Sequence, residues 1–245
     1  MSPKDLQLKL EKVEKFKRLP DKHGASYDAI DEFVPNSYLK LRDYVKSFLD
    51  YSNPENIEKS PPISASMLVA PWGLGKTTAY NKIIKNLLKK ENYNGVSIKL
   101  RAQDISNYHD TFKNKEEFKL IPGNADRFLY IISKLLLKDT KLNDKFPQLR
   151  KIETKSVELI NQVLQQIRQE KSFIVIFIDE LEEVLGNKNN IIPFILKALK
   201  DLLNGSSNIV NSEQNENLLH FLSFIIACTD HAMYEISRHE ELKYQ

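Results

Sequence analysis

Short continuous apolar runs alternate along the chain, from residue 63 onward, with segments in which apolar residues recur every three or four positions. A near-continuous run such as 173–178 predicts a strand buried on both faces, whereas the periodic segments predict amphipathic helices. We expect strands at 66–70, 95–101, 173–178 and 221–228, helices at 77–90 and 193–204, and a mostly helical stretch over 102–171. Strands that alternate with helices predict an α/β fold: a mainly parallel sheet covered on both faces, as a three-layer sandwich.

The N-terminal part of the chain has a different pattern. Apolar residues recur at helical spacing within 1–20 and again within 38–51, and both stretches are predicted to be helices. Prolines among polar residues at 52–64 indicate a linker. We therefore divide the chain into an N-terminal helical segment with its linker, 1–60, and a core, 61–245. Residue 245 follows Asp230 closely and leaves little room for a fifth strand, so we expect the front part of a longer protein.

Composition narrows the class of protein without naming a partner. The net charge of +3 permits a nucleic-acid partner but does not argue for one. The single cysteine, Cys228, excludes a disulfide within the chain, and its place at the end of an apolar run predicts a core residue. No apolar run approaches the roughly 18 residues of a membrane span, and the N-terminus lacks an apolar signal segment. We expect a cytoplasmic protein with no membrane span.

A phosphate-binding loop of the Walker A type follows the first predicted strand. It reads Ala70-Pro71-Trp72-Gly73-Leu74-Gly75-Lys76-Thr77, with Ala in place of the usual first Gly. An apolar strand before the loop and an amphipathic helix after it are the context that the motif requires. The motif predicts a P-loop nucleotide-binding fold with ATP as ligand. The alternative is a glycine-containing strand-to-helix turn without a ligand, and Trp72 fits packing over the loop as well as contact with a base.

Each residue type in this loop has a physical purpose. Gly73 and Gly75 let successive backbone N–H groups point at the β-phosphate, and the helix N-terminus adds its positive dipole end. Lys76 is expected to reach the β- and γ-phosphates, and the Thr77 hydroxyl to bind Mg²⁺. Thr78 is expected to support the α-phosphate through its backbone N–H.

The third predicted strand, 173–178, is followed by Asp179 and Glu180, which is a Walker B pattern. A buried strand would deliver Asp179 to the rim of the sheet beside the phosphate loop, where it can hold Mg²⁺, usually through water. Glu180 is then placed to polarise the attacking water. The alternative is a core strand followed by a solvated helix start. Glu182 and Glu183 are predicted to be exposed helix-start acids, with Mg²⁺ or partner contact as the alternative.

The ordered pair of motifs resembles the AAA+ ATPases and the related P-loop ATPases with an Asp-Glu Walker B strand, over roughly residues 36–240. The resemblance implies a sensor 1 strand beside the Walker B strand, ending in a polar residue that bonds the γ-phosphate or the water. Thr229 is the first choice for that residue and Asp230 the second. An N-cap on a strand-to-helix turn explains Thr229 equally well.

Three further positions follow from the resemblance alone. Phe33-Val34-Pro35 occupies the place where adenine lies in relatives, and Arg238 lies where some relatives carry an arginine finger for a neighbouring subunit. Arg101, at the end of the second strand, is a candidate for coupling to Glu180. A surface arginine is the alternative for Arg238.

The departures from the family are also informative. The helical lid and the sensor 2 arginine that should follow a fifth strand are absent, and residues 102–172 exceed a minimal crossover, which indicates a helical insertion. The resemblance is to the initiator-like or signalling branch. There is no N-K-x-D motif of a GTPase and no L-S-G-G-Q signature of an ABC subunit, and lid arginines of a small-molecule kinase are not clustered.

Two functions remain open from the sequence. The first is an ATPase that uses Mg²⁺ and ATP hydrolysis to drive a conformational change or to remodel a macromolecular partner, with homo-oligomerisation and a DNA or protein partner as expectations. The second is a nucleotide-gated DNA-binding or defence and signalling switch with little turnover. A basic N-terminal segment is the only nucleic-acid cue, and a solvated helix face explains it as well: Lys4, Lys9, Lys12, Lys15, Lys17 and Arg18.

Overall fold

The computed structural model of the chain describes residues 36–52, 64–70, 76–90, 93–152, 159–185, 191–207 and 218–238. Contacts divide the chain into two units, Met1–Leu41 and Arg42–Gln245, and the α/β core belongs to the second. The helix predicted within 1–20, the Phe33–Pro35 segment and most of the linker lie outside the described residues. The domain boundary at residue 60 stays a prediction.

Four parallel strands form the sheet, in the order β1-β4-β3-β2. They are β1 (Ser64–Val69), β2 (Gly95–Arg101), β3 (Phe173–Asp179) and β4 (Leu222–Cys228). Every residue of β3 and β4 is buried, as their mainly apolar sequences predict for strands in the middle of a covered sheet. The prediction of an α/β fold with a parallel sheet is thereby confirmed.

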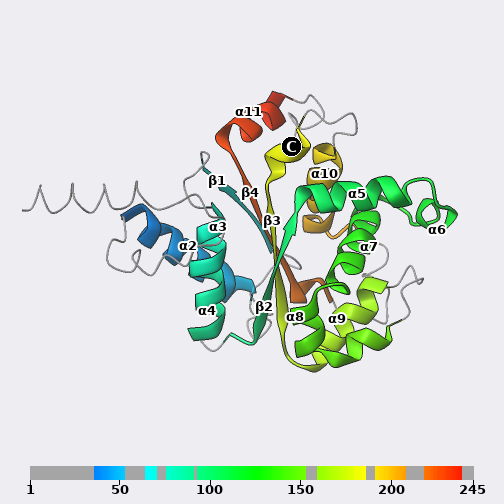
Figure 1. Cartoon of the computed structure of the whole chain (residues 1–245), viewed down its shortest axis with the longest axis horizontal. Helices are drawn as coiled ribbons and strands as arrows, with labels where there is room; N and C mark the ends of the chain where they lie inside the picture. Colours follow the sequence, from blue (N-terminus) through cyan, green and yellow to red (C-terminus); the bar gives the residue numbers. More distant parts are fainter. Residues whose placement is uncertain are drawn as a thin grey trace, which may run out of the picture. The chain divides into compact units, whose positions relative to one another are not determined.

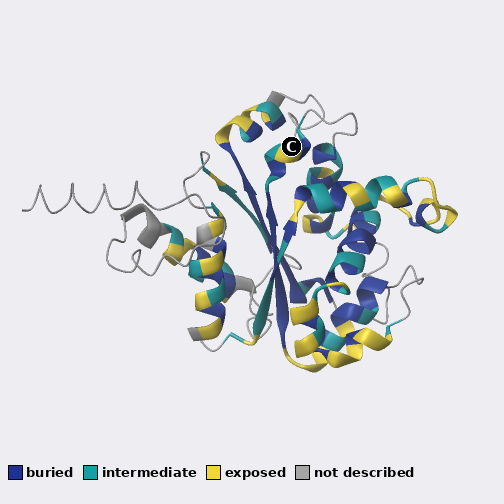
Figure 2. Ribbon diagram, viewed as in Figure 1, coloured by how far each residue is buried: buried dark blue, intermediate teal, exposed yellow. Residues whose placement is uncertain are grey.

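Helices precede, connect and follow the strands. They are α2 (Asn36–Ser52), α3 (Lys76–Thr78), η3 (Ala79–Ile84), α4 (Lys85–Lys90), α5 (Ala102–Phe112), α6 (Glu116–Lys119), α7 (Asn124–Leu136), α8 (Thr140–Lys145), η4 (Pro147–Lys151), α9 (Leu159–Gln169), η5 (Leu181–Val184), α10 (Ile192–Leu203), η6 (Leu218–Phe221) and α11 (Asp230–Arg238). Figure 1 shows α3 and α4 on one face of the sheet and α5, α7, α9 and α10 on the other. In Figure 2 the two middle strands, β3 and β4, are dark blue throughout, whereas β1 and β2 at the edges of the sheet are mostly teal.

Strand boundaries differ slightly from those predicted. β1 starts at Ser64 and ends at Val69, yet Ala70 continues the ladder, since its N–H donates to the Cys228 carbonyl at 3.1 Å. β4 starts at Leu222 because residues 218–221 form the short 3-10 helix η6. Phe221, which was predicted to begin the strand, is the last residue of this 3-10 helix.

The helix predicted over 77–90 is regular only at its two ends. Its middle, η3, is a π-helix, although this segment contains neither proline nor glycine. The expected face is nevertheless buried, including Tyr80, Ile83 and Leu87. Tyr80 fixes the segment to the sheet: its hydroxyl donates to the Ser97 carbonyl at 3.1 Å, and its ring lies 4.9 Å from the Phe177 ring, centroid to centroid.

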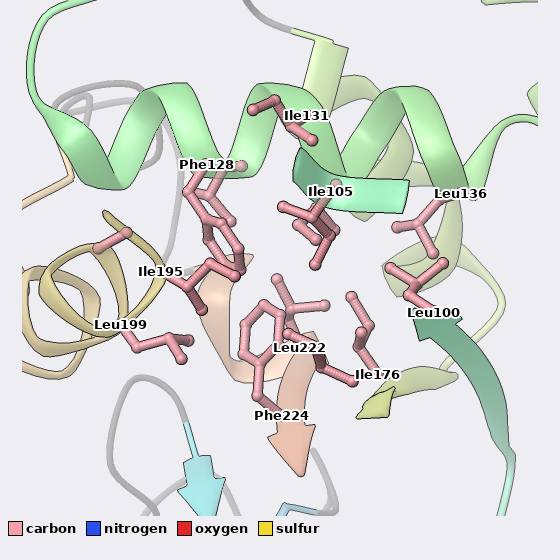
Figure 3. Packing of buried hydrophobic residues seen from close by; sticks show 14 of the residues in the cluster. Leu100, Ile105, Phe128, Ile131, Leu136, Ile176, Ile195, Leu199, Leu222 and Phe224 are labelled. Atoms are coloured by element: carbon pink, nitrogen blue, oxygen red, sulfur yellow. The ribbon is translucent and has the colours of Figure 1, made fainter. Parts of the chain in front are cut away.

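The main hydrophobic core lies between the sheet and the layer that contains α7 and α10. Phe128 of α7 and Phe224 of β4 meet with ring centroids 5.6 Å apart, and α10 contributes Ile195 and Leu199 to the same place (Figure 3). The long stretch after β2 is thus helical, as predicted, and its apolar face covers the strand that carries the Walker B acids. The burial of these apolar side chains stabilises the packing of the helices on the sheet, and this packing fixes the positions of the carboxyl ends of the strands.

Gly95, the first residue of β2, is a close-approach position. A Cβ atom there would lie 2.7 Å from Cζ of Phe173 and 2.8 Å from Cδ2 of Leu88. Since both side chains are buried, Gly95→Ala should lower the free energy of unfolding by about 1–2 kcal/mol through overpacking. Urea denaturation measures this loss, and adding Phe173→Leu should recover part of it. A Gly95→Ala variant as stable as the wild type would show that the side chains of Phe173 and Leu88 can move aside without loss of stability.

Candidate active site

Residues singled out in the sequence gather at the carboxyl edge of the sheet. Ala70 follows β1, Asp179 ends β3 and Thr229 follows β4, and these strands are parallel, so the three residues lie at one rim. α3 begins at this rim with Lys76. The carboxyl end of an open parallel sheet is where α/β proteins bind ligands.

Thr77 and Asp179 are brought together from positions 102 residues apart in the sequence. The Thr77 hydroxyl donates to Oδ2 of Asp179 at 2.9 Å. Asp179 is almost fully buried, with a side-chain exposure of 2%, and its Oδ1 accepts the backbone N–H of Glu180 at 3.0 Å. One hydroxyl and one carboxylate suit Mg²⁺ held jointly with phosphate oxygens and water, and not an all-protein cage. Among the described residues, no three His, Cys, Asp or Glu side chains form a cluster that could hold a metal ion.

Lys99 completes the surroundings of Asp179 and was not identified from the sequence. Its Nζ lies 2.7 Å from Oδ2 of Asp179, while the lysine side chain keeps 29% of its exposure. A buried carboxylate needs such a partner because an unpaired buried charge is strongly unfavourable. The signal in the sequence is a lysine flanked by Ile98 and Leu100 inside a strand, close to the end of that strand.

Arg101, the predicted partner of Glu180, is instead bound by Asp104. Its Nε and Nη2 donate to the Asp104 carboxylate at 3.2 and 3.0 Å, one turn into α5. In the sheet register Arg101 lies opposite Asp179, so its charge is near the site without a direct bond to Glu180. The charge of Arg101 lowers the pKa of Glu180, but this influence is smaller than that of the groups that raise it.

Glu180 has an unusual backbone. Its φ of 61° and ψ of 41° place it in the left-handed region, where a residue with a Cβ costs about 1–3 kcal/mol. Such strain is characteristic of sites whose surroundings fix a side chain for chemistry. The pKa of the half-buried carboxyl is raised, first by burial and then by the charges of Glu183 and Asp179. Glu180 is therefore a stronger proton acceptor than an ordinary surface glutamate.

Glu182 contradicts the prediction made for it. It was expected to be an exposed helix-start acid, yet its side chain is only 9% exposed, and its Oε1 lies 3.7 Å from Nζ of Lys76. Lys76 also donates to the Ala70 carbonyl at 2.9 Å. The reason for the error is that η5 is a tight 3-10 turn that brings Glu182 back over the rim of the sheet. Glu183 is exposed, as predicted.

Thr229 acts as a helix cap in this structure. Its buried hydroxyl accepts the backbone N–H of Ala232 at 3.1 Å, which caps the start of α11, so the capping interpretation of Thr229 holds. The hydroxyl proton is still available for a second bond, so capping does not exclude the sensor role. The Thr229 N–H points at Oε2 of Glu182, 3.3 Å away. Asp230 is exposed.

Cys228, next to this threonine, is a core residue, as the sequence predicted. It is fully buried. Burial, and then the charge of Glu182, raise the pKa of its thiol to about 11. The thiol is therefore protonated at neutral pH and poorly suited to nucleophilic chemistry.

Other predicted residues cannot be placed in the site. Pro71, Trp72, Gly73, Leu74 and Gly75 lie outside the described residues, so the site is defined by the groups on either side of the loop. Thr78 belongs to α3 and Arg238 is the last residue of α11. Among the helices in the described part of the chain, none combines the length and the apolarity needed to cross a lipid bilayer.

Comparisons with known proteins complete the description. The model of the family described as "ATPase family associated with various cellular activities (AAA)" matches residues 66–238. No curated protein matched the chain. Among solved structures, the ORC1 protein of Aeropyrum pernix, determined in complex with DNA, is similar with 12% sequence identity and a TM-score of 0.43. The match covers 89% of this chain and 44% of that one, so the chain spans less than half the length of that protein.

Proposed function

The chain belongs to the AAA family of ATPases, and from this premise we propose that it binds ATP with Mg²⁺ and hydrolyses the β–γ phosphoanhydride. The observation that carries the proposal is the meeting of Thr77 and Asp179 beside Lys76 at the start of α3. Hydrolysis would drive a conformational change or the remodelling of a macromolecular partner. The proposed ATPase core is 61–245, and a DNA or protein partner and assembly with further copies are part of the same proposal.

The proposal assigns each residue of the site a separate task. Lys76 binds the β- and γ-phosphates, while the loop 70–75 and Thr78 surround the phosphates with backbone N–H groups. Thr77 and Asp179 hold Mg²⁺, which when bound neutralises phosphate charge and orients the oxygens. Lys99, whose Nζ lies 2.7 Å from Oδ2 of Asp179, would share this carboxylate with the ion.

Glu180 is the proposed catalytic residue. Its carboxylate accepts a hydrogen bond from the attacking water and takes up the proton as the water oxygen bonds to the γ-phosphorus. The bond from that phosphorus to the β–γ bridging oxygen breaks, and ADP leaves. The left-handed backbone fixes the direction of the side chain, and the raised pKa strengthens it as a base. Thr229 is the proposed sensor, using its remaining hydroxyl proton.

The pH dependence of hydrolysis should report the environment of Glu180. Because its raised pKa means that protonation begins at a higher pH, the rate should fall on acidification at a pH above that expected for an ordinary glutamate. Glu183→Gln removes one of the charges that raise this pKa, so the acidic limb should move to lower pH. Single-turnover rates between pH 4.5 and 8 measure the shift. An acidic limb unchanged in the variant would contradict the assignment of Glu180 as the base.

Single-turnover release of phosphate tests the proposed function itself. Enzyme in excess over Mg·ATP should release phosphate in one exponential phase. ATP that binds tightly without release of phosphate would instead support a nucleotide-gated DNA-binding or signalling switch with little turnover.

A further inference from the structure

Glu182 joins two parts of the site that neither Walker motif connects. One carboxylate oxygen, Oε1, lies 3.7 Å from the ammonium nitrogen of Lys76, and the other, Oε2, accepts the backbone N–H of Thr229 at 3.3 Å. Lys76 begins α3 after the phosphate loop, and Thr229 lies between β4 and α11. A single side chain thus spans from the proposed phosphate-binding lysine to the start of the last described helix.

The ion pair between Glu182 and Lys76 is shielded from solvent, yet its geometry lets another anion displace Glu182. The side chains of Lys76 and Glu182 are only 10% and 9% exposed, so solvent screens their attraction weakly. Their separation of 3.7 Å is nevertheless longer than a direct charge-assisted hydrogen bond, which measures about 2.7–2.9 Å. A phosphate group brings more negative charge and more acceptor oxygens than one carboxylate, so it should compete successfully for the ammonium.

Through its contact with Thr229, Glu182 links the competition between phosphate and carboxylate for Lys76 to the start of α11. Thr229 caps α11 through its hydroxyl, and its carbonyl accepts the N–H of Met233 at 3.0 Å. Its own N–H is the group that Glu182 holds. A carboxylate that moves away from Lys76 would lengthen or break its bond to this N–H, and so release the start of α11.

We propose that Glu182 is a phosphate-responsive latch that holds Lys76 and the start of α11 together until the phosphates of the nucleotide displace it from the lysine. This inference rests on the proposed function, because it requires that phosphates bind at Lys76. Glu182 acts through Lys76 and Thr229, and it is therefore a positioning residue. It makes α11 the element that first senses whether the site is filled.

The test compares Glu182→Gln with Glu170→Gln. Glutamine keeps the size of the side chain and an acceptor for the Thr229 N–H but removes the charge that competes for Lys76. Glu170 precedes β3, at the end of the strand opposite the site, so its variant matches the change of charge without touching the latch. Affinities for ATP, ADP and AMP are measured by calorimetry, and hydrogen exchange is followed in overlapping peptides that begin upstream of Thr229 and extend through 238.

Glu182→Gln should bind ATP and ADP about fivefold more tightly than the wild type. AMP affinity and the Glu170→Gln variant should be unchanged, since AMP has no phosphate that reaches Lys76. In the wild type, ATP and ADP, but not AMP, should speed exchange of the Thr229 amide, and this response should vanish in Glu182→Gln.

Unchanged or weaker ATP affinity in Glu182→Gln would overturn the latch. So would wild-type exchange over 229–238 that does not respond to ATP, a measurement that needs no variant. If the wild type binds no nucleotide at all, the proposed function itself fails. If the wild type binds ATP and the Glu182→Gln and Glu170→Gln variants show the same affinities and the same hydrogen exchange, only the latch fails.

Discussion

Glu180→Gln should lower the single-turnover rate of ATP hydrolysis by about 10²–10⁴-fold while ATP still binds. Glutamine preserves the size and the hydrogen-bonding reach of the side chain but cannot accept the proton of the attacking water. The effect should be large because the left-handed backbone fixes the direction of the Glu180 side chain. In addition, burial and the charges of Glu183 and Asp179 raise its pKa and make it a stronger base. Rapid-quench measurement of phosphate release gives the rate.

The control for this prediction is Glu170→Gln, which removes a negative charge far from the carboxyl edge of the sheet and should hydrolyse ATP as the wild type does. ATP affinity of Glu180→Gln within about threefold of the wild type shows that the loss lies in the chemical step. A rate within tenfold of the wild type would mean that another group activates the water, and the assignment of Glu180 would be wrong.

Lys99→Met should destabilise the nucleotide-free protein by about 2–3 kcal/mol. Breaking a buried ion pair by removing one partner costs about 3–5 kcal/mol, and the partial exposure of Lys99 lowers this figure. The variant leaves Asp179 buried with only the Thr77 hydroxyl and the Glu180 N–H as hydrogen-bond donors within the described residues. The midpoint temperature of thermal unfolding should fall by roughly 4–12 °C.

A double variant separates the ion pair from other losses. Adding Asp179→Asn to Lys99→Met removes the stranded charge, so stability should recover by more than half, and the two substitutions should be strongly non-additive. Lys89→Met, at an exposed position of α4, is the matched control and should change stability by less than about 0.5 kcal/mol. Additive effects in the double variant would show that Lys99 does not stabilise Asp179.

The parts of the fold that could be predicted are those determined by local pattern. β3 is apolar from Phe173 to Ile178 and β4 is apolar except for Ser223, and their burial on both faces follows from that character. Asp179 and Thr77 could be located because each stands at a fixed place beside a strand or a helix start. Their contact follows from the parallel arrangement of β1, β4 and β3.

Lys99 and Glu182 could not be predicted because their roles depend on reach across elements. Lys99 depends on the register of β2 against β3, which places Phe177 opposite it and lets its long side chain extend to Asp179. Glu182 depends on a 3-10 turn after β3, where a regular α-helix would have carried it outward. The hydrophobic pattern contains neither the register nor the type of turn.

The most direct test of the central claim is an equilibrium titration of the wild type and Lys76→Ala with Mg·ATP. The account predicts saturable binding of one ATP per chain, weakened about 100-fold in Lys76→Ala through loss of charge-assisted bonds to phosphate. Binding that is absent in the wild type, or equally tight in Lys76→Ala, would contradict the assignment of this rim of the sheet as an ATP site.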